Sequence, residues 1–153
     1  MTGAVLTILR AGIIAGTLDI TDALVFYGLR GAKPLAILQS IASGLLGPAA
    51  YKGGVRTAVL GLLLHFFIAC TASAIFYVAA KRLGLLRRYA VISGLLYGFA
   101  IYLVMNWIVL PLSAVSKPRP AVPAISLLNG VLAVVVLVGL PISLIVSRRI
   151  GRG

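Results

Sequence analysis

Residues 55–80 read VRTAVLGLLLHFFIACTASAIFYVAA, and this stretch decides the fold. Apart from Arg56 near its start and His65 within it, it holds no side chain that carries a full charge near neutral pH. A helix rises about 1.5 Å per residue, so about 20 residues cross a hydrocarbon core of about 30 Å. Because backbone polar groups in lipid must bond internally, the stretch is predicted to cross a membrane as one helix.

Three more apolar runs of similar length accompany this one, at residues 5–27, 89–113 and 122–147. Of the 153 residues, 61% are hydrophobic and only 10% are charged, and the mean hydropathy is +1.15. A soluble domain of this size cannot bury so much apolar surface. The chain is therefore predicted to be an all-α membrane protein, a bundle of four transmembrane helices that forms a single domain over residues 1–153. The first run is interpreted as a retained span rather than a signal peptide, because no basic residue precedes Arg10.

A shorter apolar segment, PLAILQSIASGLLG at residues 34–47, follows the first predicted span. It is too short to cross the bilayer, and Gln39 and Ser43 interrupt it. Pro34 suits the first turn of a helix, and Gly47 followed by proline is typical of a helix end. The segment is therefore predicted to be a short helix between the first two spans, either interfacial or re-entrant.

Charge is distributed unevenly, with fourteen Lys and Arg residues against two acids and a formal net charge of +12. In a soluble chain this balance would suggest nucleic-acid binding. Here the cations lie in short clusters between apolar runs, so the expected partner is the lipid bilayer with its anionic headgroups, and nucleic acid is not expected. The side with both termini and the loop at 81–88 carries eight cations, if Arg10 is counted, against six on the other side. This excess predicts a multi-pass protein with both termini cytoplasmic.

Both acids, Asp19 and Asp22, lie inside the first predicted span. An ionisable group in a transmembrane helix costs several kcal/mol, so it normally faces the interior and has a partner. Their spacing of three residues places the two carboxylates on one helix face. Asp19 lies roughly 12 Å from the end of its span, and His65 and Asn106 lie roughly 15 Å and 10 Å from the same membrane side. These side chains are therefore predicted to share one half of the bilayer.

Further polar residues are expected near Asp19, Asp22, His65 and Asn106, which together form a predicted polar layer in this half of the bilayer. Tyr102 lies one helical turn before Asn106, and Arg56 lies near the start of the second span. Gln39 reaches the same depth if the segment 34–47 is re-entrant. With the acids and His65, these residues form the predicted intramembrane polar site.

Small residues form two stripes at helical spacing. Gly12 and Gly16 continue the acidic face toward the N-terminus, and Gly94 and Gly98 lie one turn apart in the third span. A Gly-x-x-x-Gly pattern lets another helix approach closely. The four glycines are therefore predicted to be helix-packing positions, used either within one molecule or between copies.

Two interpretations of the polar layer remain open. In the structural one, the acids pair with Arg56 or His65 and hydrogen-bond Asn106 and Tyr102, which fixes helices that lack a hydrophobic drive to associate in lipid. In the functional one, the acids and the histidine form a proton or cation site, because neighbouring carboxylates perturb each other and histidine titrates near neutrality.

Several strings carry a resemblance to known proteins: GTLDI at 16–20, LQSIASGLLG at 38–47, and GLLYG at 94–98 followed by Met105-Asn106. They resemble a group of uncharacterised small bacterial multi-pass membrane proteins, catalogued as hypothetical or YagU-like inner-membrane proteins. The similarity covers most of the chain through the third span. The resemblance implies a bacterial inner (cytoplasmic) membrane and supplies no activity and no site residue.

The sequence favours a function through association, as a homo-oligomer or an accessory subunit of a membrane complex, because the glycine stripes offer contact surfaces. The alternative is a small transporter or channel for a proton, cation or small solute, with Asp19, Asp22 and His65 in its pathway. No motif for a nucleophile, a metal or a phosphate loop is present, so no enzyme, cofactor or metal is expected. A membrane-embedded hydrolase that uses the same three residues is a less favoured alternative.

Overall fold

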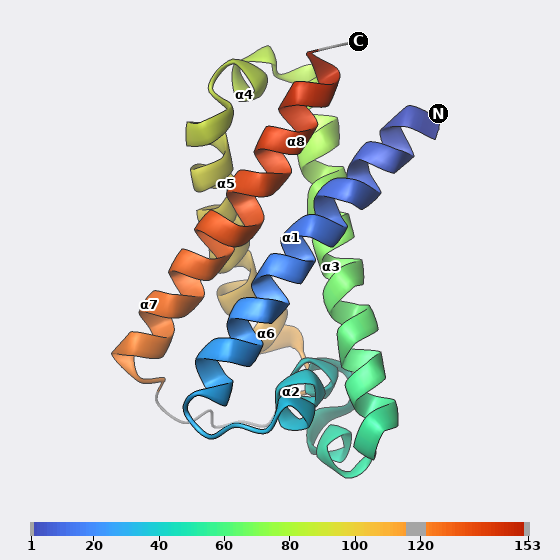
Figure 1. Cartoon of the computed structure of the whole chain (residues 1–153), viewed down its shortest axis with the longest axis vertical. Coiled ribbons are helices and arrows are strands. Elements are labelled where there is room, and N and C mark those ends of the chain that lie inside the picture. The colour runs from blue at the N-terminus through green and yellow to red at the C-terminus, as the bar shows by residue number, and fades with distance from the viewer. Residues whose placement is uncertain (1, 116–121, 152–153) are drawn as a thin grey trace.

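The computed structural model describes residues 2–115 and 122–151, except for the Thr2 side chain, and within them every regular element is helical (Figure 1). Four stretches are long and apolar enough to cross a membrane: Gly3–Gly28, Gly54–Arg82, Ala90–Leu112 and Ala124–Ile150. The prediction of an all-helical chain with four such spans is thus confirmed. The last span continues past its predicted end at residue 147. Arginines in its final turn interact favourably with the negative end of the helix dipole and so stabilise this extension. The predicted polar break at 116–120 lies outside the described residues.

The first two spans are single helices, α1 (Thr2–Gly28) and α3 (Gly54–Arg82). The third consists of α5 (Ala90–Val104), the π-helical segment η2 (Met105–Val109) and α6 (Leu110–Leu112). The fourth consists of α7 (Ala124–Leu132), the π-helical segment η3 (Ala133–Gly139) and α8 (Leu140–Ile150). Shorter helices connect the spans: α2 (Pro34–Leu46), the 3₁₀ helix η1 (Gly47–Lys52) and α4 (Gly84–Arg88).

Each π-helical segment ends two residues before a proline, η2 before Pro111 and η3 before Pro141. The residue that precedes the proline, Leu110 in one span and Leu140 in the other, donates its backbone N–H to the carbonyl five residues back, on Met105 and Val135 respectively. Proline has no N–H, and its ring crowds the carbonyl four residues before it, so the helix widens locally instead of breaking.

The four spans lie alongside one another, and both described ends of the chain are at one end of the molecule (Figure 1). The α1 helix packs against α3 and against the fourth span, and α5 packs against the fourth span as well. In the half near the termini, the interior is filled by an apolar cluster of mostly small residues: Ala11, Ala15, Ala72, Phe76, Ala80, Val138, Ile142 and Val146. Many large apolar side chains lie on the outside, as suits helices surrounded by lipid.

The predicted packing glycines all lie at contacts between spans of one molecule: Gly12 and Gly16 against α3, and Gly94 and Gly98 against the fourth span. A Cβ added to Gly98 would lie 2.6 Å from the Cα of Val135, whereas nonbonded carbon atoms pack at about 3.5–4.0 Å. The missing side chains therefore let helix backbones touch within the molecule.

The α2 helix lies at the end of the molecule opposite the termini and packs against α3 (Figure 1). Pro34 occupies its first turn, and Gly47 ends it with a φ of 61°, a conformation that a side chain would strain. The buried Gln39 donates from Nε2 to the Gly54 carbonyl at 2.9 Å and to the Thr57 hydroxyl at 3.2 Å. These bonds tie α2 to the start of α3.

Candidate functional site

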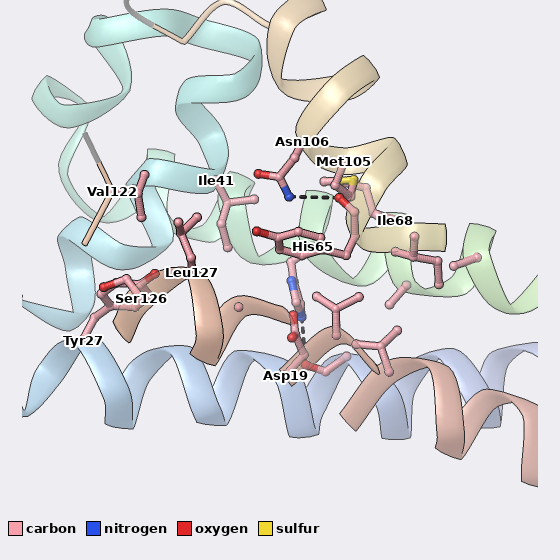
Figure 2. A pocket seen from close by; sticks show the side chains of 18 residues that line it. Asp19, Tyr27, Ile41, His65, Ile68, Met105, Asn106, Val122, Ser126 and Leu127 are labelled. Atoms are coloured by element: carbon pink, nitrogen blue, oxygen red, sulfur yellow. Dashed lines mark hydrogen bonds between the residues drawn. The ribbon is translucent and has the colours of Figure 1, made fainter. Parts of the chain in front are cut away.

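A cavity of about 400 Å³ lies between the spans in the half of the molecule near α2 (Figure 2). All four spans and α2 contribute to its walls, which are mostly apolar. Its polar side chains are few: Asp19, Tyr27, His65, Tyr102, Asn106 and Ser126. A mostly apolar cavity with a few convergent polar groups is the usual composition of a small-molecule site.

His65 connects α3 to α1 at one wall of this cavity. Its Nε2 lies 2.8 Å from the carbonyl oxygen of Gly16. A carbonyl oxygen can only accept a hydrogen bond, so Nε2 carries the hydrogen. In the neutral ring, Nδ1 is then left with a lone pair and acts as a proton acceptor.

Asp19 follows Gly16 by one turn of α1 and lies beside the His65 ring (Figure 2). His65 and Asp22 are the ionisable groups that act on it electrostatically. Within residues 2–115 and 122–151, no side chain or backbone group donates a hydrogen bond to the Asp19 carboxylate. The cavity wall therefore holds a carboxylate and an imidazole that lie side by side and both face the cavity.

Asp22, one turn further along α1, has a different environment. Its Oδ2 accepts a hydrogen bond of 2.7 Å from Nδ2 of Asn129 in α7. Sequence reasoning missed Asn129, although an amide inside an apolar span is itself a signal of a polar contact. The two acids, predicted as one unit, are thus separated: Asp22 ties α1 to α7, and Asp19 faces the cavity.

A second cavity, of about 540 Å³, adjoins the first. The two share four wall residues: Asp19, Tyr27, Ile41 and His65. The other walls of the second cavity include Ala32, in the turn after α1, and Tyr51, in η1, so this cavity reaches the end of the molecule near α2. Asp19 and His65 therefore stand where the two cavities meet.

The first cavity extends past the midpoint of α3. Its walls include Ala72, which lies roughly 27 Å from the start of a helix that is roughly 44 Å long. Beyond this point an apolar cluster lies between α1, α3 and the fourth span, with Phe76 1% exposed and Ile142 fully buried. A separate cavity of about 570 Å³ lies between α3, α4 and α5 in the same half. The two cavities thus lie mainly in the half near α2, and the apolar cluster lies between them and the termini.

The remaining predicted site residues are distributed differently. Asn106 and Tyr102 both line the first cavity, but Asn106 donates to the backbone carbonyl of Tyr102 at 2.9 Å rather than to an acid. Gln39 and Arg56 line neither cavity, and Arg56 is exposed near the start of α3. The structure does not bring Arg56 to the acids, because water at the surface solvates its guanidinium while the acids lie deeper.

Within the described ranges, no group of three or more His, Cys, Asp or Glu side chains is close enough to hold a metal ion. The chemistry that the wall residues offer is proton exchange and cation binding by Asp19, with the His65 ring as a second proton acceptor.

Comparisons with known protein families, with curated proteins and with solved structures give no match to this chain. The resemblance to small bacterial inner-membrane proteins therefore stays a prediction.

Proposed function

We propose that this protein is a small membrane transporter for protons or other small cations, with Asp19 and His65 as the groups that bind the transported ion. One observation carries the proposal: these two side chains stand where a cavity that reaches the end near α2 meets a cavity that extends past the middle of α3. A carboxylate that faces a cavity inside a membrane span, with no hydrogen bond from the described residues, is available to a cation.

The histidine geometry supports proton transfer in particular. The bond from Nε2 to the Gly16 carbonyl holds the ring in place and directs one tautomer. A proton that arrives from the end near α2 can then pass between the Asp19 carboxylate and Nδ1 of His65 through a water molecule in the shared cavity, since the two side chains make no direct hydrogen bond. Each group accepts a proton in one form and donates it in the other, which is what a relay needs.

The apolar cluster near the termini favours a carrier over a channel. The apolar cluster that includes Phe76, Ile142 and Val146 lies between the two cavities and the termini. The cavity between α3, α4 and α5 shares no wall residue with either of them. Release of an ion on that side requires the spans to repack, as in transport by alternating access.

The proposed setting is a four-helix bundle in a bacterial inner membrane with both termini cytoplasmic. In this setting α2 is an interfacial helix at the opposite membrane surface. Its buried residues are Ile37, Gln39, Ala42 and Ser43, whereas Leu35 and Leu45 are exposed. The exposed leucines support an apolar face toward lipid.

Association with other copies or with a larger complex also stays a prediction. Its motivation was the pair of glycine stripes, and these stripes make their contacts between spans of one molecule. They therefore no longer argue for a partner, which is why transport is the function preferred here.

The two acids provide a matched pair for the test. Purified protein is placed in liposomes with an internal pH-sensitive dye, and the initial proton flux is measured under a pH gradient with the membrane potential clamped. Asp19→Asn should lower the flux by about 100-fold or more, the usual effect of losing a proton-transfer group. Asp22→Asn should leave the flux unchanged, because its new amide still accepts the bond from Asn129.

His65→Gln reports on the relay and should slow proton flux more than flux of Na⁺ or K⁺, measured with matching dyes. A parent protein that moves none of these ions would refute the proposal. So would equal losses in Asp19→Asn and Asp22→Asn, since that pattern means a general structural defect.

A further inference from the structure

A groove of about 370 Å³ lies between α1 and α8 at the end of the molecule that holds the termini. Three arginines line this basic groove, Arg10 from α1 and Arg148 and Arg149 from α8. All three are exposed, and the two helices lie alongside each other (Figure 1). Two different spans thus bring guanidinium groups to one depression.

The arginines of the basic groove have no acidic side chain to pair with. Asp19 and Asp22 are the only acids in the chain. The nearer one lies nine residues after Arg10 on the same helix, which is roughly 13 Å along its axis. The negative end of the α8 dipole stabilises the positive charge of Arg148 and Arg149. The positive end of the α1 dipole lies beside them and offsets part of this effect. The groove therefore has a surplus of positive charge that no acidic side chain of the protein neutralises.

The side chains that line the basic groove suit a phosphate group with an apolar neighbour. Arg149 reaches over the bare backbone of Gly3, with its Nη2 3.6 Å from the place where a Cβ would stand. Guanidinium groups bind phosphate oxygens through paired N–H donors. Leu6 and Ile145 line the same groove, and Leu6 is 49% exposed, so an apolar surface adjoins the cations.

We propose that the basic groove binds a phosphate group through Arg10, Arg148 and Arg149. Anionic lipid headgroups and free phosphate share this chemistry, and the apolar wall at Leu6 and Ile145 is the feature that only a lipid would use. This site lies at the opposite end from the cavities, so it is independent of the transport proposal.

Native mass spectrometry of the whole chain in a mild detergent tests the proposal. The added probes are phosphatidylglycerol, phosphatidylcholine and inorganic phosphate. The groove variant is Arg10→Gln, Arg148→Gln and Arg149→Gln together. The control variant removes three other exposed cations from the same end, through Lys81→Gln, Arg82→Gln and Arg88→Gln.

The parent should retain phosphatidylglycerol in preference to phosphatidylcholine. A cation near an anionic lipid contributes about fivefold in affinity, so the groove variant should lose on the order of 100-fold. The control variant should lose clearly less than the groove variant. Binding of inorganic phosphate with the same dependence on the groove, together with no retention of lipid, would identify free phosphate as the source.

Two results would overturn the proposal: no binding of phosphatidylglycerol or phosphate to the parent, or equal losses in the groove and control variants, which would mean a diffuse surface potential. The melting temperature in detergent gives a second readout. Phosphatidylglycerol should raise it for the parent and the control variant but not for the groove variant. If the groove variant does not fold, the three arginines are replaced by lysines, which keep the charge and should still weaken binding because they lack the paired donors.

Discussion

Replacing Gly98 with alanine should force α5 away from η3. The added Cβ would lie 2.6 Å from the Cα of Val135 and 2.8 Å from the carbonyl oxygen of Val134. Carbon atoms pack at about 3.5–4.0 Å, so the two backbones must separate by about 1 Å. Both contacting atoms belong to a helix backbone and cannot rotate aside. Overpacking of this kind costs about 1–3 kcal/mol of the free energy of unfolding.

Thermal unfolding in a mild detergent measures this cost. Each kcal/mol shifts the melting temperature of a chain of this size by about 2–4 °C, so Gly98→Ala should lower it by about 2–12 °C. Gly28→Ala is the matched control, because a Cβ added at Gly28 meets no atom within 4 Å. Alanine is also the better helix former by about 1 kcal/mol, so the melting temperature of this control should stay or rise.

Size-exclusion profiles of the same two variants complete the experiment. The contact at Gly98 lies within one molecule, so the oligomeric state should not change while the melting temperature falls. The reasoning is refuted if Gly98→Ala and Gly28→Ala behave alike. An oligomer that dissociates at an unchanged melting temperature would instead place Gly98 at a contact between molecules.

Two further changes test polar contacts between spans. Asn129→Ala removes the donor to Asp22 and should lower the free energy of unfolding by about 1–2 kcal/mol; in a double-mutant cycle with Asp22→Ala, which removes the acceptor, fully additive losses would contradict the bond. Tyr97→Phe removes the hydroxyl that donates to the Ala72 carbonyl at 2.7 Å and should cost about 1 kcal/mol in the same unfolding assay, whereas an equal loss for the exposed Tyr89→Phe would argue against that bond.

The spans could be predicted from the sequence because one physical requirement dominates them. A helix that crosses lipid must contain about 20 apolar residues, and each run has that length. Its prediction therefore does not depend on which other segments it contacts. The π-helical segments were not predicted, although the proline that causes each one is visible in the sequence. Proline inside a helix leads to a kink, a break or a wider turn, and the packing around it decides which.

The separation of Asp19 from Asp22 shows what spacing alone leaves open. Successive residues of a helix are rotated by about 100°, so residues three apart differ by about 60° around the axis. This angle keeps both carboxylates on one broad face, yet it is enough to direct one toward the cavity and the other toward Asn129 in α7. Which helix lies on each side of the acidic face depends on the three-dimensional arrangement of all four spans.

Arg56 was predicted near the acids because it begins the second span, and counting residues places that start on the same membrane side. Counting residues gives the correct end of the molecule for Arg56, but it does not give the depth at which a long cationic side chain places its charge. An arginine near a helix end can keep its guanidinium in water at little cost, whereas moving it inward loses that hydration. The structure accordingly leaves Arg56 exposed.

The contacts between spans, made by residues such as Gly12, Gly94 and Gly98, invert the usual relation between residue size and tolerance to mutation. In a soluble protein, the large apolar residues are buried and their exchange is costly. Here many large apolar residues, such as Leu63 and Phe67, face outward, where one lipid-soluble side chain can replace another. The demanding positions are those with almost no side chain, so a mutational scan of this protein should find its most sensitive sites among the smallest residues.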